Sequence, residues 1–445
     1  MKKIQRFGLL APLALLSLTA CSDKVYKSLP SMSKPSIILK SVAPVEFVFK
    51  EKALSQIIDQ PDVQASITKL SSLNYSVQGA KAAFSTNITA SADGGLIAED
   101  TDASPAINPS INATRTLMDG GIKQSGLDIA NLNLKLAQYE TALIIDEKLA
   151  FAIEANISQE YVTAVNETFE EFEKYYELQE ENLQQAVSFG AVSQLQMLNL
   201  SQRLLAIEAQ KISVKELELN IKNLLQKSSD TTLIIEDNFI DTDDLRSKIE
   251  ASTVPVLTLS KITENIAENR ILSALGKGQM GVSTVGRLSK SSSDGIAIEA
   301  FAGVQVSIPI FDGGRLDAEV LTLQTEKESI VTSNKATKKR IIEGHDLLSL
   351  QQNLGFQKIS LTRDQLEKAT EKRKMNEDLL VSGQINLSEI VESFIKELEL
   401  KIELADNQLK TKLRQLDMLK NTGLVCSAIS ACEEIIEFTS TRLND

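Results

Sequence analysis

The stretch 300–316 changes from a strand pattern to a helix pattern within a few residues. Apolar residues first alternate with small or polar ones, which is typical of a strand with two unlike faces. A turn made of Asp312, Gly313 and Gly314 follows, and the chain carries no proline after it. Asp312 can accept hydrogen bonds from the first free helical N–H groups, and the glycines permit a sharp change of direction. We therefore predict a strand, a turn and a long helix here.

The same order of patterns occurs earlier in the chain. A strand over 107–117 leads into a second turn, which consists of Asp119, Gly120 and Gly121, and a proline-free helical pattern follows over 122–187. The two turns are 193 positions apart, and so are Gly190 and Gly383, which interrupt the two helical patterns. One alignment without gaps covers both pairs, so the sequence predicts a duplicated chain.

The duplication divides the chain into two α+β repeats, each with a helix, a strand–loop–strand unit and a hairpin of two long helices. Repeat 1 is predicted over 46–227, with its strands within 79–117 and its helix hairpin over 122–227. Repeat 2 is predicted over 258–421, with its strands within 280–310 and its helix hairpin over 316–421. A polar insert over 228–257 joins the repeats, and a tail over 422–445 follows them.

Finer limits follow from the same pattern. In repeat 1 we expect a helix over 46–73 that Pro61 kinks or breaks, a strand over 79–90 and an exposed loop over 91–105. In the insert we expect a short strand over 233–235 and a short helix over 241–249. In repeat 2 we expect a helix over 258–275 and strands over 280–288 and 296–310.

Within one chain, the long helices lack enough packing partners and the strands lack partners at the edges of their sheet. As one helix, 122–187 would extend roughly 100 Å, which requires coiled-coil partners. Four strands per chain cannot close a barrel, and a sheet in lipid has no free edge because its N–H and C=O groups would lack partners. Three chains would supply about 12 strands, within the range of outer-membrane barrels. We therefore predict that the chain assembles with other copies of itself, and that three copies form a barrel of about 12 strands.

The first 20 residues have the pattern of an export signal. Three basic residues precede a short apolar core, and small residues then precede Cys21. This is the pattern of a bacterial lipobox, in which the Cys21 thiol carries the lipid, and Ser22 favours delivery to the outer membrane. An ordinary cleaved signal with an incidental cysteine is the alternative. Residues 21–45 carry three prolines among serines and lysines, which is typical of an extended tether.

Composition excludes several classes of function. The net charge is −13, so the chain has no electrostatic footprint for nucleic acid. The sequence shows no nucleophile–base pair, phosphate loop or ligand cluster, so we expect neither an enzyme nor a metal or cofactor site. The single histidine, His345, is expected to be a partly solvated helix residue. Cys426 and Cys432 are expected to form a local disulfide rather than a metal site, because the exported chain reaches an oxidising compartment.

Together these features resemble the TolC-like outer-membrane efflux protein family, in the form of a lipoprotein member. The resemblance covers about 46–419 and rests on the lipobox, the two strand–loop–strand units, the two Asp-Gly-Gly turns and the two hairpin glycines. It implies a homotrimer in the outer membrane of a Gram-negative bacterium, with a trimeric 12-stranded β-barrel that is continued by a long α-helical periplasmic barrel. It also implies an exit duct for drug efflux or type I protein secretion, with a periplasmic adaptor and an inner-membrane transporter as partners.

The resemblance places the gate at the hairpin tips around Gly190 and Gly383, which are also the expected adaptor-docking surface. Glu389 and Glu392 are three positions apart and share one helix face. Three copies would place six carboxylates around the axis, where they would favour cations. A solvated helix face is the alternative for this pair.

Other gate positions depart from the family. Gln196 stands where a carboxylate is expected, Leu380 stands at a tyrosine position and Ile385 stands at an arginine position. We therefore expect apolar packing of Leu380, Ile385 and Leu387 to close the tips, in place of a salt-bridged lock.

A structural or adhesive coiled-coil lipoprotein without transport activity is the alternative function. It explains the helices and the lipobox, and the lack of tryptophan favours it because membrane barrels usually carry aromatic girdles. It does not explain the duplicated strand pairs.

Overall fold

The computed structural model describes residues 57–99, 102–228, 239–291 and 297–426 of the chain. The export signal, Cys21, the tether, the expected strand over 233–235 and Cys432 lie outside the described residues.

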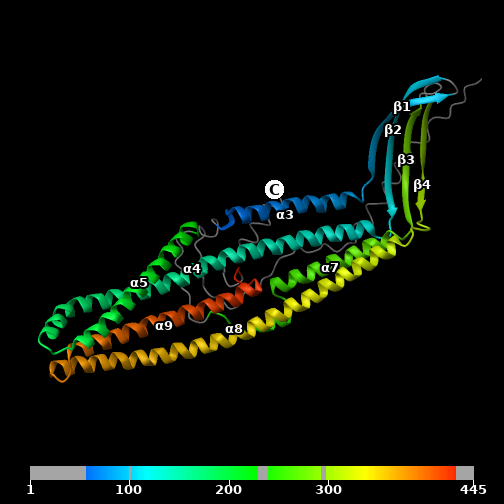
Figure 1. Cartoon of the computed structure of the whole chain (residues 1–445). Coiled ribbons are helices and arrows are strands. Elements are labelled where there is room, and N and C mark those ends of the chain that lie inside the picture. Colours follow the sequence, from blue (N-terminus) through cyan, green and yellow to red (C-terminus); the bar gives the residue numbers. More distant parts are fainter. Residues whose placement is uncertain (1–56, 100–101, 229–238, 292–296, 427–445) are drawn as a thin grey trace, which may run out of the picture. The chain divides into compact units, whose positions relative to one another are not determined.

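Each repeat contains one short helix, two strands and two long helices (Figure 1). Repeat 1 comprises α3 (Pro61–Ala82), β1 (Asn87–Glu99), β2 (Asp102–Met118), α4 (Ile122–Ser188) and α5 (Gln194–Ser228). Repeat 2 comprises α7 (Pro255–Gly276), β3 (Gly281–Ser291), β4 (Ala297–Ser307), α8 (Arg315–Val381) and α9 (Leu387–Thr422). The short helix α6 (Thr242–Glu250) stands between the repeats in the chain, where the sequence predicts it.

The two repeats match element by element. α4 and α8 each contain 67 residues, and both their first and their last residues are 193 positions apart. α3 and α7 each contain 22 residues, and each begins with a proline. Proline suits the first turn of a helix because its missing N–H has no partner there. Pro61 therefore interrupts the helix expected over 46–73 by starting a new one.

Three predicted strand limits are wrong. Residues 79–82 belong to α3, because Ala80, Lys81 and Ala82 are good helix formers. Most of the expected loop over 91–105 belongs to β1 or β2. The residues of these two strands pair with one another as far as Glu99 and Asp102. β4 ends at Ser307 rather than at 310, because Pro309 has no N–H to continue a ladder.

The four strands form one antiparallel sheet in the order β1–β2–β3–β4. Ile111 on β2 lies opposite Ala90 on β1 and Leu288 on β3, and Leu288 lies opposite Ala300 on β4. β1 and β4 are therefore edge strands, each with one side that has no strand partner within the described chain.

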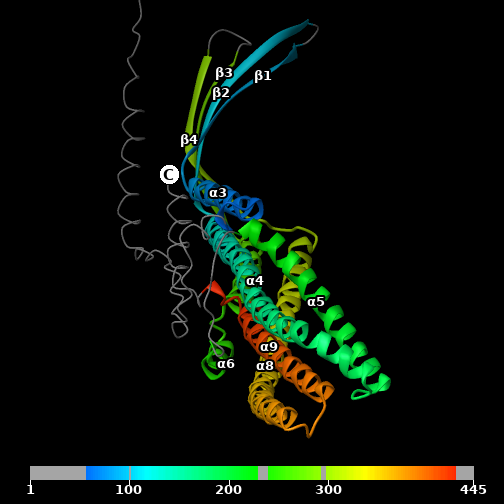
Figure 2. The same cartoon turned by 90° about the vertical axis from the view of Figure 1, so that its left-hand side faces the viewer.

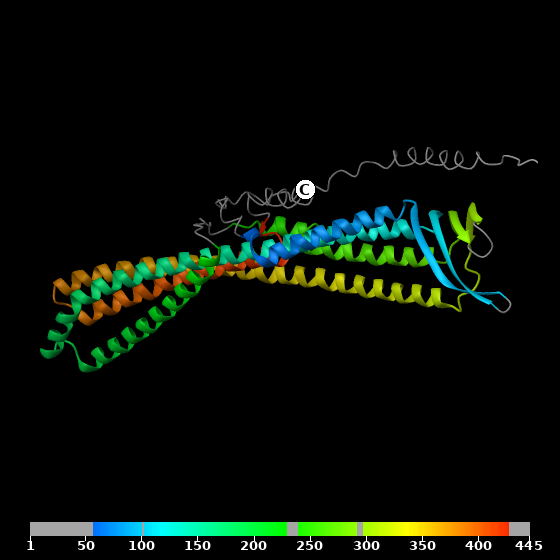
Figure 3. The ribbon, with the colours of Figure 1, turned by 90° about the horizontal axis from the view of Figure 1, so that it is seen from above.

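The helices lie side by side in two overlapping rows. One row has the order α5–α4–α9–α8 (Figure 2), and the other has the order α3–α4–α7–α8 (Figure 1). α8 therefore forms one end of both rows. The other end is α5 in the first row and α3 in the second. The strands lie at one end of the long helices, and the α4–α5 and α8–α9 turns lie at the other (Figure 3).

A core of apolar side chains joins α4, α5 and α9. Its aromatic centre is Phe394 of α9, whose ring stacks on Tyr175 of α4 at 4.2 Å and lies 5.8 Å from the ring of Phe172. Such aromatic pairs add about 0.5–1.5 kcal/mol to the burial of the rings. The two hairpins are therefore held together by apolar packing well before their tips. None of the described helices is both long and apolar enough to span a lipid bilayer.

Candidate functional site

At both strand–helix junctions an aspartate caps the long helix that follows. Asp119 and Asp312 each accept hydrogen bonds from the backbone N–H groups two and four positions ahead, at 3.1 and 2.9 Å for Asp119 and at 3.0 and 2.8 Å for Asp312. These backbone donors lower the pKa of the Asp312 carboxyl. The glycines of both turns have positive φ, between 66° and 85°; they are Gly120, Gly121, Gly313 and Gly314. The aspartates thus fix where the strands end and the helices begin.

The two junctions differ in their surroundings. Gly120 lies so close to the end of α7 that a Cβ on it would stand 2.5 Å from the carbonyl oxygen of Gly276. A Cβ on Gly313, the matching position of repeat 2, would meet nothing within 4 Å. Gly120 of repeat 1 is therefore in close contact with the end of α7, whereas the matching Gly313 has free space around it within the described chain.

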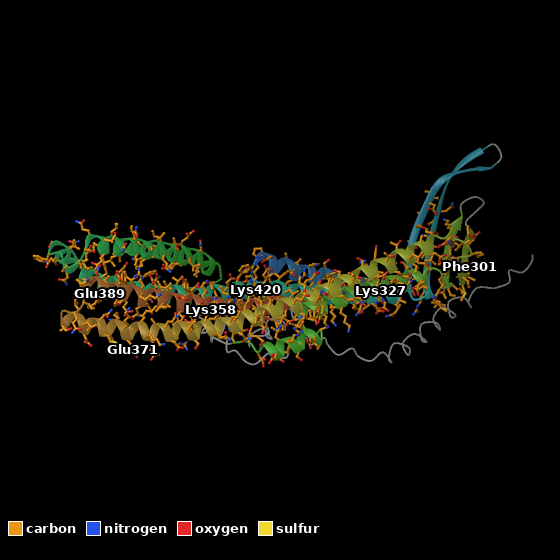
Figure 4. All side chains as sticks on the ribbon, turned by 60° about the horizontal axis from the view of Figure 1, so that its bottom comes forward. Phe301, Lys327, Lys358, Glu371, Glu389 and Lys420 are labelled. Atoms are coloured by element: carbon orange, nitrogen blue, oxygen red, sulfur yellow. The ribbon has the colours of Figure 1, made fainter. Side chains whose placement is uncertain are left out.

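The sheet has one mainly apolar face and one mainly polar face. The strand register places on the first face the side chains of Ile88, Ala90, Ile107, Ile111, Ala113, Val282, Leu288, Ile298, Ala300, Val304 and Val306, together with Arg115, Thr284 and Lys290. Apart from Val282, its larger apolar members are exposed. The other face carries Asn, Ser, Thr and Gln side chains, and Arg287 donates there to Asn112 Oδ1 at 3.0 Å. Phe301 is an aromatic exception on this polar face (Figure 4). A sheet of this kind is suited to separating lipid from water.

The two hairpin tips turn at glycines in the left-handed region, Gly190 with φ 74° and Gly383 with φ 72°. A polar residue then caps each second helix. Gln196 accepts from the backbone N–H of Ser193 at 2.9 Å, while the Ser193 hydroxyl accepts from the N–H of Gln196 at 3.2 Å. This reciprocal pair is a capping box. Gln196 therefore has a structural role that sequence reasoning missed, although the Ser-x-x-Gln pattern was readable.

The predicted gate residues gather at the α8–α9 tip. Glu389 is exposed near the end of the helices (Figure 4). Glu392 follows it after three positions and is half-buried. Leu380 and Ile385 are half-buried, and Leu387 packs against the core of apolar side chains. Within the described chain, neither glutamate forms an ion pair.

Comparison with known proteins finds no matching family model and no matching curated protein. Solved structures do match. CusC, which forms a transmembrane channel, is 14% identical with a TM-score of 0.68, over 84% of this chain and 92% of CusC. The outer-membrane protein VceC of Vibrio cholerae is 13% identical with a TM-score of 0.67, over 84% and 95%. The CmeC outer-membrane channel of Campylobacter jejuni is 13% identical with a TM-score of 0.63, over 87% and 88%.

This chain has the TolC-like fold. The match supports the fold class predicted from the sequence, with four strands per chain and duplicated long helices.

Within this TolC-like fold, a charge network lies between the hairpins, about two to five turns from the helix ends at the tips. Glu397 of α9 accepts from Arg373 Nε of α8 at 2.6 Å and lies 3.2 Å from Lys401 Nζ, which in turn binds Glu171 of α4 at 2.7 Å. Burial alone would raise the pKa of Glu397, but the hydrogen bonds and charges of Arg373 and Lys401 outweigh it and lower the pKa. Sequence reasoning missed this network because its members lie on three helices.

His345 is buried, so the expectation of a partly solvated histidine is wrong. Its Nε2 lies 3.0 Å from the backbone oxygen of Thr242 at the start of α6, which packs on α8. Burial lowers the pKa of the imidazole. No group of three or more His, Cys, Asp or Glu side chains able to hold a metal occurs in the part of the chain that the structure describes.

After the end of α9, the chain is held against α4 by a hydrogen bond. The backbone N–H of Cys426 donates to Asp146 at 2.6 Å, and burial raises the pKa of the Asp146 carboxyl to about 7. Cys426 is disulfide-bonded. Its pairing with Cys432 stays a prediction, because Cys432 lies outside the described residues.

Proposed function

We propose that this protein is an outer-membrane channel, and that it serves as the exit duct of a tripartite export system. The observation that carries the proposal is the amphipathic sheet, whose strands run directly into the capped long helices of a TolC-like fold. An apolar face toward lipid and a polar face toward a water-filled interior are what a membrane barrel requires.

The edge strands support a homotrimer. β1 and β4 would leave rows of unpaired N–H and C=O groups in lipid, each costing several kcal/mol, unless another copy pairs with them. If β4 of each copy pairs with β1 of the next, three copies close a barrel of about 12 strands. The long helices then extend into the periplasm, and the acyl chain on Cys21 adds a second hold on the outer membrane.

The gate is proposed at the α8–α9 tip. Three copies of Glu389 and Glu392 form a ring of six carboxylates that attracts cations, and Leu380, Ile385 and Leu387 close the ring by apolar contact. The exposed turns at Gly190 and Gly383 are the docking surface for a periplasmic adaptor, which links the channel to an inner-membrane transporter. Drug efflux and type I protein secretion both use a duct of this kind.

Single-channel recording in planar bilayers tests the channel and its gate together. The detergent-extracted protein should conduct ions with cation selectivity and be blocked by divalent cations. Glu389→Gln with Glu392→Gln should weaken both properties. Glu403→Gln is the matched control, because it removes an exposed carboxylate from the same helix about 16 Å beyond Glu392. Equal selectivity in all variants would remove the glutamates from the pore, and a protein that never conducts would refute the channel.

The alternative of a structural coiled-coil lipoprotein keeps one supporting observation, the lack of tryptophan. The same recording decides between the two functions, because a structural lipoprotein does not conduct.

A further inference from the structure

The polar face of the sheet carries an aromatic ring and a cation on neighbouring strands. Phe301 of β4 and Arg287 of β3 are partners in the strand register, and Asn112 of β2 is the other partner of Arg287. Within the four described strands, Phe301 is the only aromatic residue and Arg287 the only cation that the register places on this face. Such a pair stands out among the small polar residues that surround it.

A series of hydrogen bonds across the sheet orients the Arg287 side chain. The hydroxyl groups of Ser91 and Ser110 are 2.8 Å apart, and Asn112 Nδ2 donates to Ser110 Oγ at 3.4 Å. The amide oxygen of Asn112 is thereby turned toward β3, where it accepts from Arg287 Nε at 3.0 Å. The guanidinium of Arg287 is therefore held over the sheet on the side of β2.

Most donors of this guanidinium have no partner. The Arg287 side chain is exposed, and it forms no ion pair with any carboxylate of the described chain. Asn112 uses the N–H on Nε, so the N–H groups on Nη1 and Nη2 remain available. Two parallel N–H groups of this kind bind a carboxylate at both of its oxygens. Arg287 can therefore receive an anion without giving up its bond to Asn112.

The ring of Phe301 lies over Gly303 of the same strand. A Cβ on Gly303 would stand 2.7 Å from Phe301 Cζ. Covering a strand glycine with an aromatic ring is a known way to stabilise a sheet. This role explains where the ring lies, but the Phe301 side chain is still 61% exposed. Val285 is the partner of Gly303 in the register, so the ring and Val285 form a small apolar patch.

The spacing of the cation and the ring defines the shape of a ligand. Phe301 is on β4, and the guanidinium is turned from β3 toward β2. One to two strand spacings, about 5–10 Å, therefore separate the two groups. A ligand that reaches both has an anionic group at one end and a flat apolar body at the other. Amphipathic organic anions have this form.

We propose that Arg287 and Phe301 form a weak binding site for amphipathic organic anions, with a carboxylate on the guanidinium and the apolar body on the ring. The proposal rests on the proposed function, in which the polar face lines the interior of the channel, and it names a class of cargo. Three copies supply three such sites, at the end of the molecule away from Glu389 (Figure 4). Weak binding suits a conduit, because the cargo has to leave again.

Glu299 gives the site a nearby negative charge. It is exposed, lies two positions before Phe301 on the same face of β4, and forms no ion pair within the residues that the structure describes. Its carboxylate repels an anion that is bound at Arg287. Removing this charge should therefore strengthen the binding of an anion, whereas removing the charge of Arg287 should weaken it.

Titration of phenylbutyrate against the full chain in lipid nanodiscs, followed by saturation-transfer NMR with empty nanodiscs as the blank, measures this binding. Phenylbutyrate joins a carboxylate to a phenyl ring through a short linker. Butyrate lacks the ring and phenylbutylamine replaces the anion by a cation, so both should bind more weakly. Arg287→Gln and Phe301→Ala should each raise the dissociation constant by roughly three- to tenfold. Glu299→Gln should lower it.

Matched variants separate the site from general effects. Lys290→Gln removes a cation from the opposite face of β3 and should leave binding unchanged. Phe301→Tyr keeps the ring and should keep the binding. Phe301→Leu still covers Gly303 and replaces Phe301→Ala if the smaller side chain disturbs the sheet.

Loss of phenylbutyrate binding in Arg287→Gln and in the variants that lack the ring, but not in Lys290→Gln, supports the proposal. Equal binding by all variants, or equal binding of phenylbutylamine, would overturn it. Bilayer recording of the same preparation keeps the two proposals apart. A protein that conducts but binds no phenylbutyrate overturns this site alone, whereas a protein that never conducts refutes the proposed function.

Discussion

Two glutamates of α9, each paired with an arginine of another helix, differ mainly in burial, and together they form a matched test of the charge network. Glu397 accepts from Arg373 at 2.6 Å, and its side chain is 5% exposed. Glu399, two residues later on the same helix, accepts from Arg203 at 2.7 Å and is 43% exposed. We therefore expect Glu397→Gln to destabilise the protein and Glu399→Gln to have little effect.

The expected magnitudes follow from what each substitution leaves behind. Removing one partner of a buried ion pair costs about 3–5 kcal/mol. Arg373 keeps Glu377 at 2.5 Å and Lys401 keeps Glu171 at 2.7 Å. We therefore expect the smaller cost of a lost hydrogen bond between charged groups, about 2–3 kcal/mol, for Glu397→Gln. Exposed pairs contribute about 0–1 kcal/mol, which is the expectation for Glu399→Gln.

Guanidinium unfolding of the detergent-solubilised protein, followed by helical circular dichroism, measures both costs. With a slope on the order of 5 kcal/mol per M, Glu397→Gln should lower the midpoint by about 0.5 M, and Glu399→Gln by less than about 0.2 M. The contribution of Glu397 is present above its ordinary pKa of 4.5 and is lost as the pH falls through its lowered folded-state pKa. The gap between wild type and Glu397→Gln should therefore narrow below pH 4.5. Equal midpoint shifts for the two variants would refute the reasoning.

Three further predictions concern single positions. The raised pKa of Asp146 means that its contribution to stability is present below pH 3.8 and is lost as the pH rises through about 7, a change of up to about 4 kcal/mol. Asp146→Asn should flatten the pH dependence of the unfolding midpoint in this range, and an unchanged profile would contradict the assignment. Gly120→Ala adds a clash with Gly276 to the strain of positive φ, whereas Gly121→Ala adds strain alone. Gly120→Ala should therefore cost about 1–3 kcal/mol more in the same unfolding assay, and equal costs would count against the close contact. Ser193→Ala removes a helix cap and should cost about 1 kcal/mol, measured as a lower unfolding midpoint; no loss would show that the cap does not contribute.

The helix layout was predictable because its signals are local. Asp312 and Asp119 with their glycines mark helix starts, and Gly190 and Gly383 mark helix ends, so α4 was placed to within a residue at both ends and α8 at its start. The strand limits were not predictable in the same way. The polar residues of 91–99 and 102–105 resemble a loop, but they extend β1 and β2 because each pairs with a residue of the other strand.

Contacts between distant helices carried no signal in a single sequence. Arg373 and Glu397 are 24 positions apart, and Lys401 and Glu171 are 230 positions apart, so only the packing of α8, α9 and α4 brings them together. His345 was misjudged for the same reason, since α6 covers it from another part of the chain.

In the proposed trimer, the two edge strands of the sheet would have a genetic consequence. A chain that is damaged only on β1 keeps an intact β4, so it would still join a second copy but would leave an edge that no neighbour covers. When such a chain is made in equal amount with the normal one, roughly one in eight of the three-copy rings would contain normal copies only. Alleles that alter one edge strand should therefore act dominantly over the wild type, whereas alleles that prevent folding should be recessive.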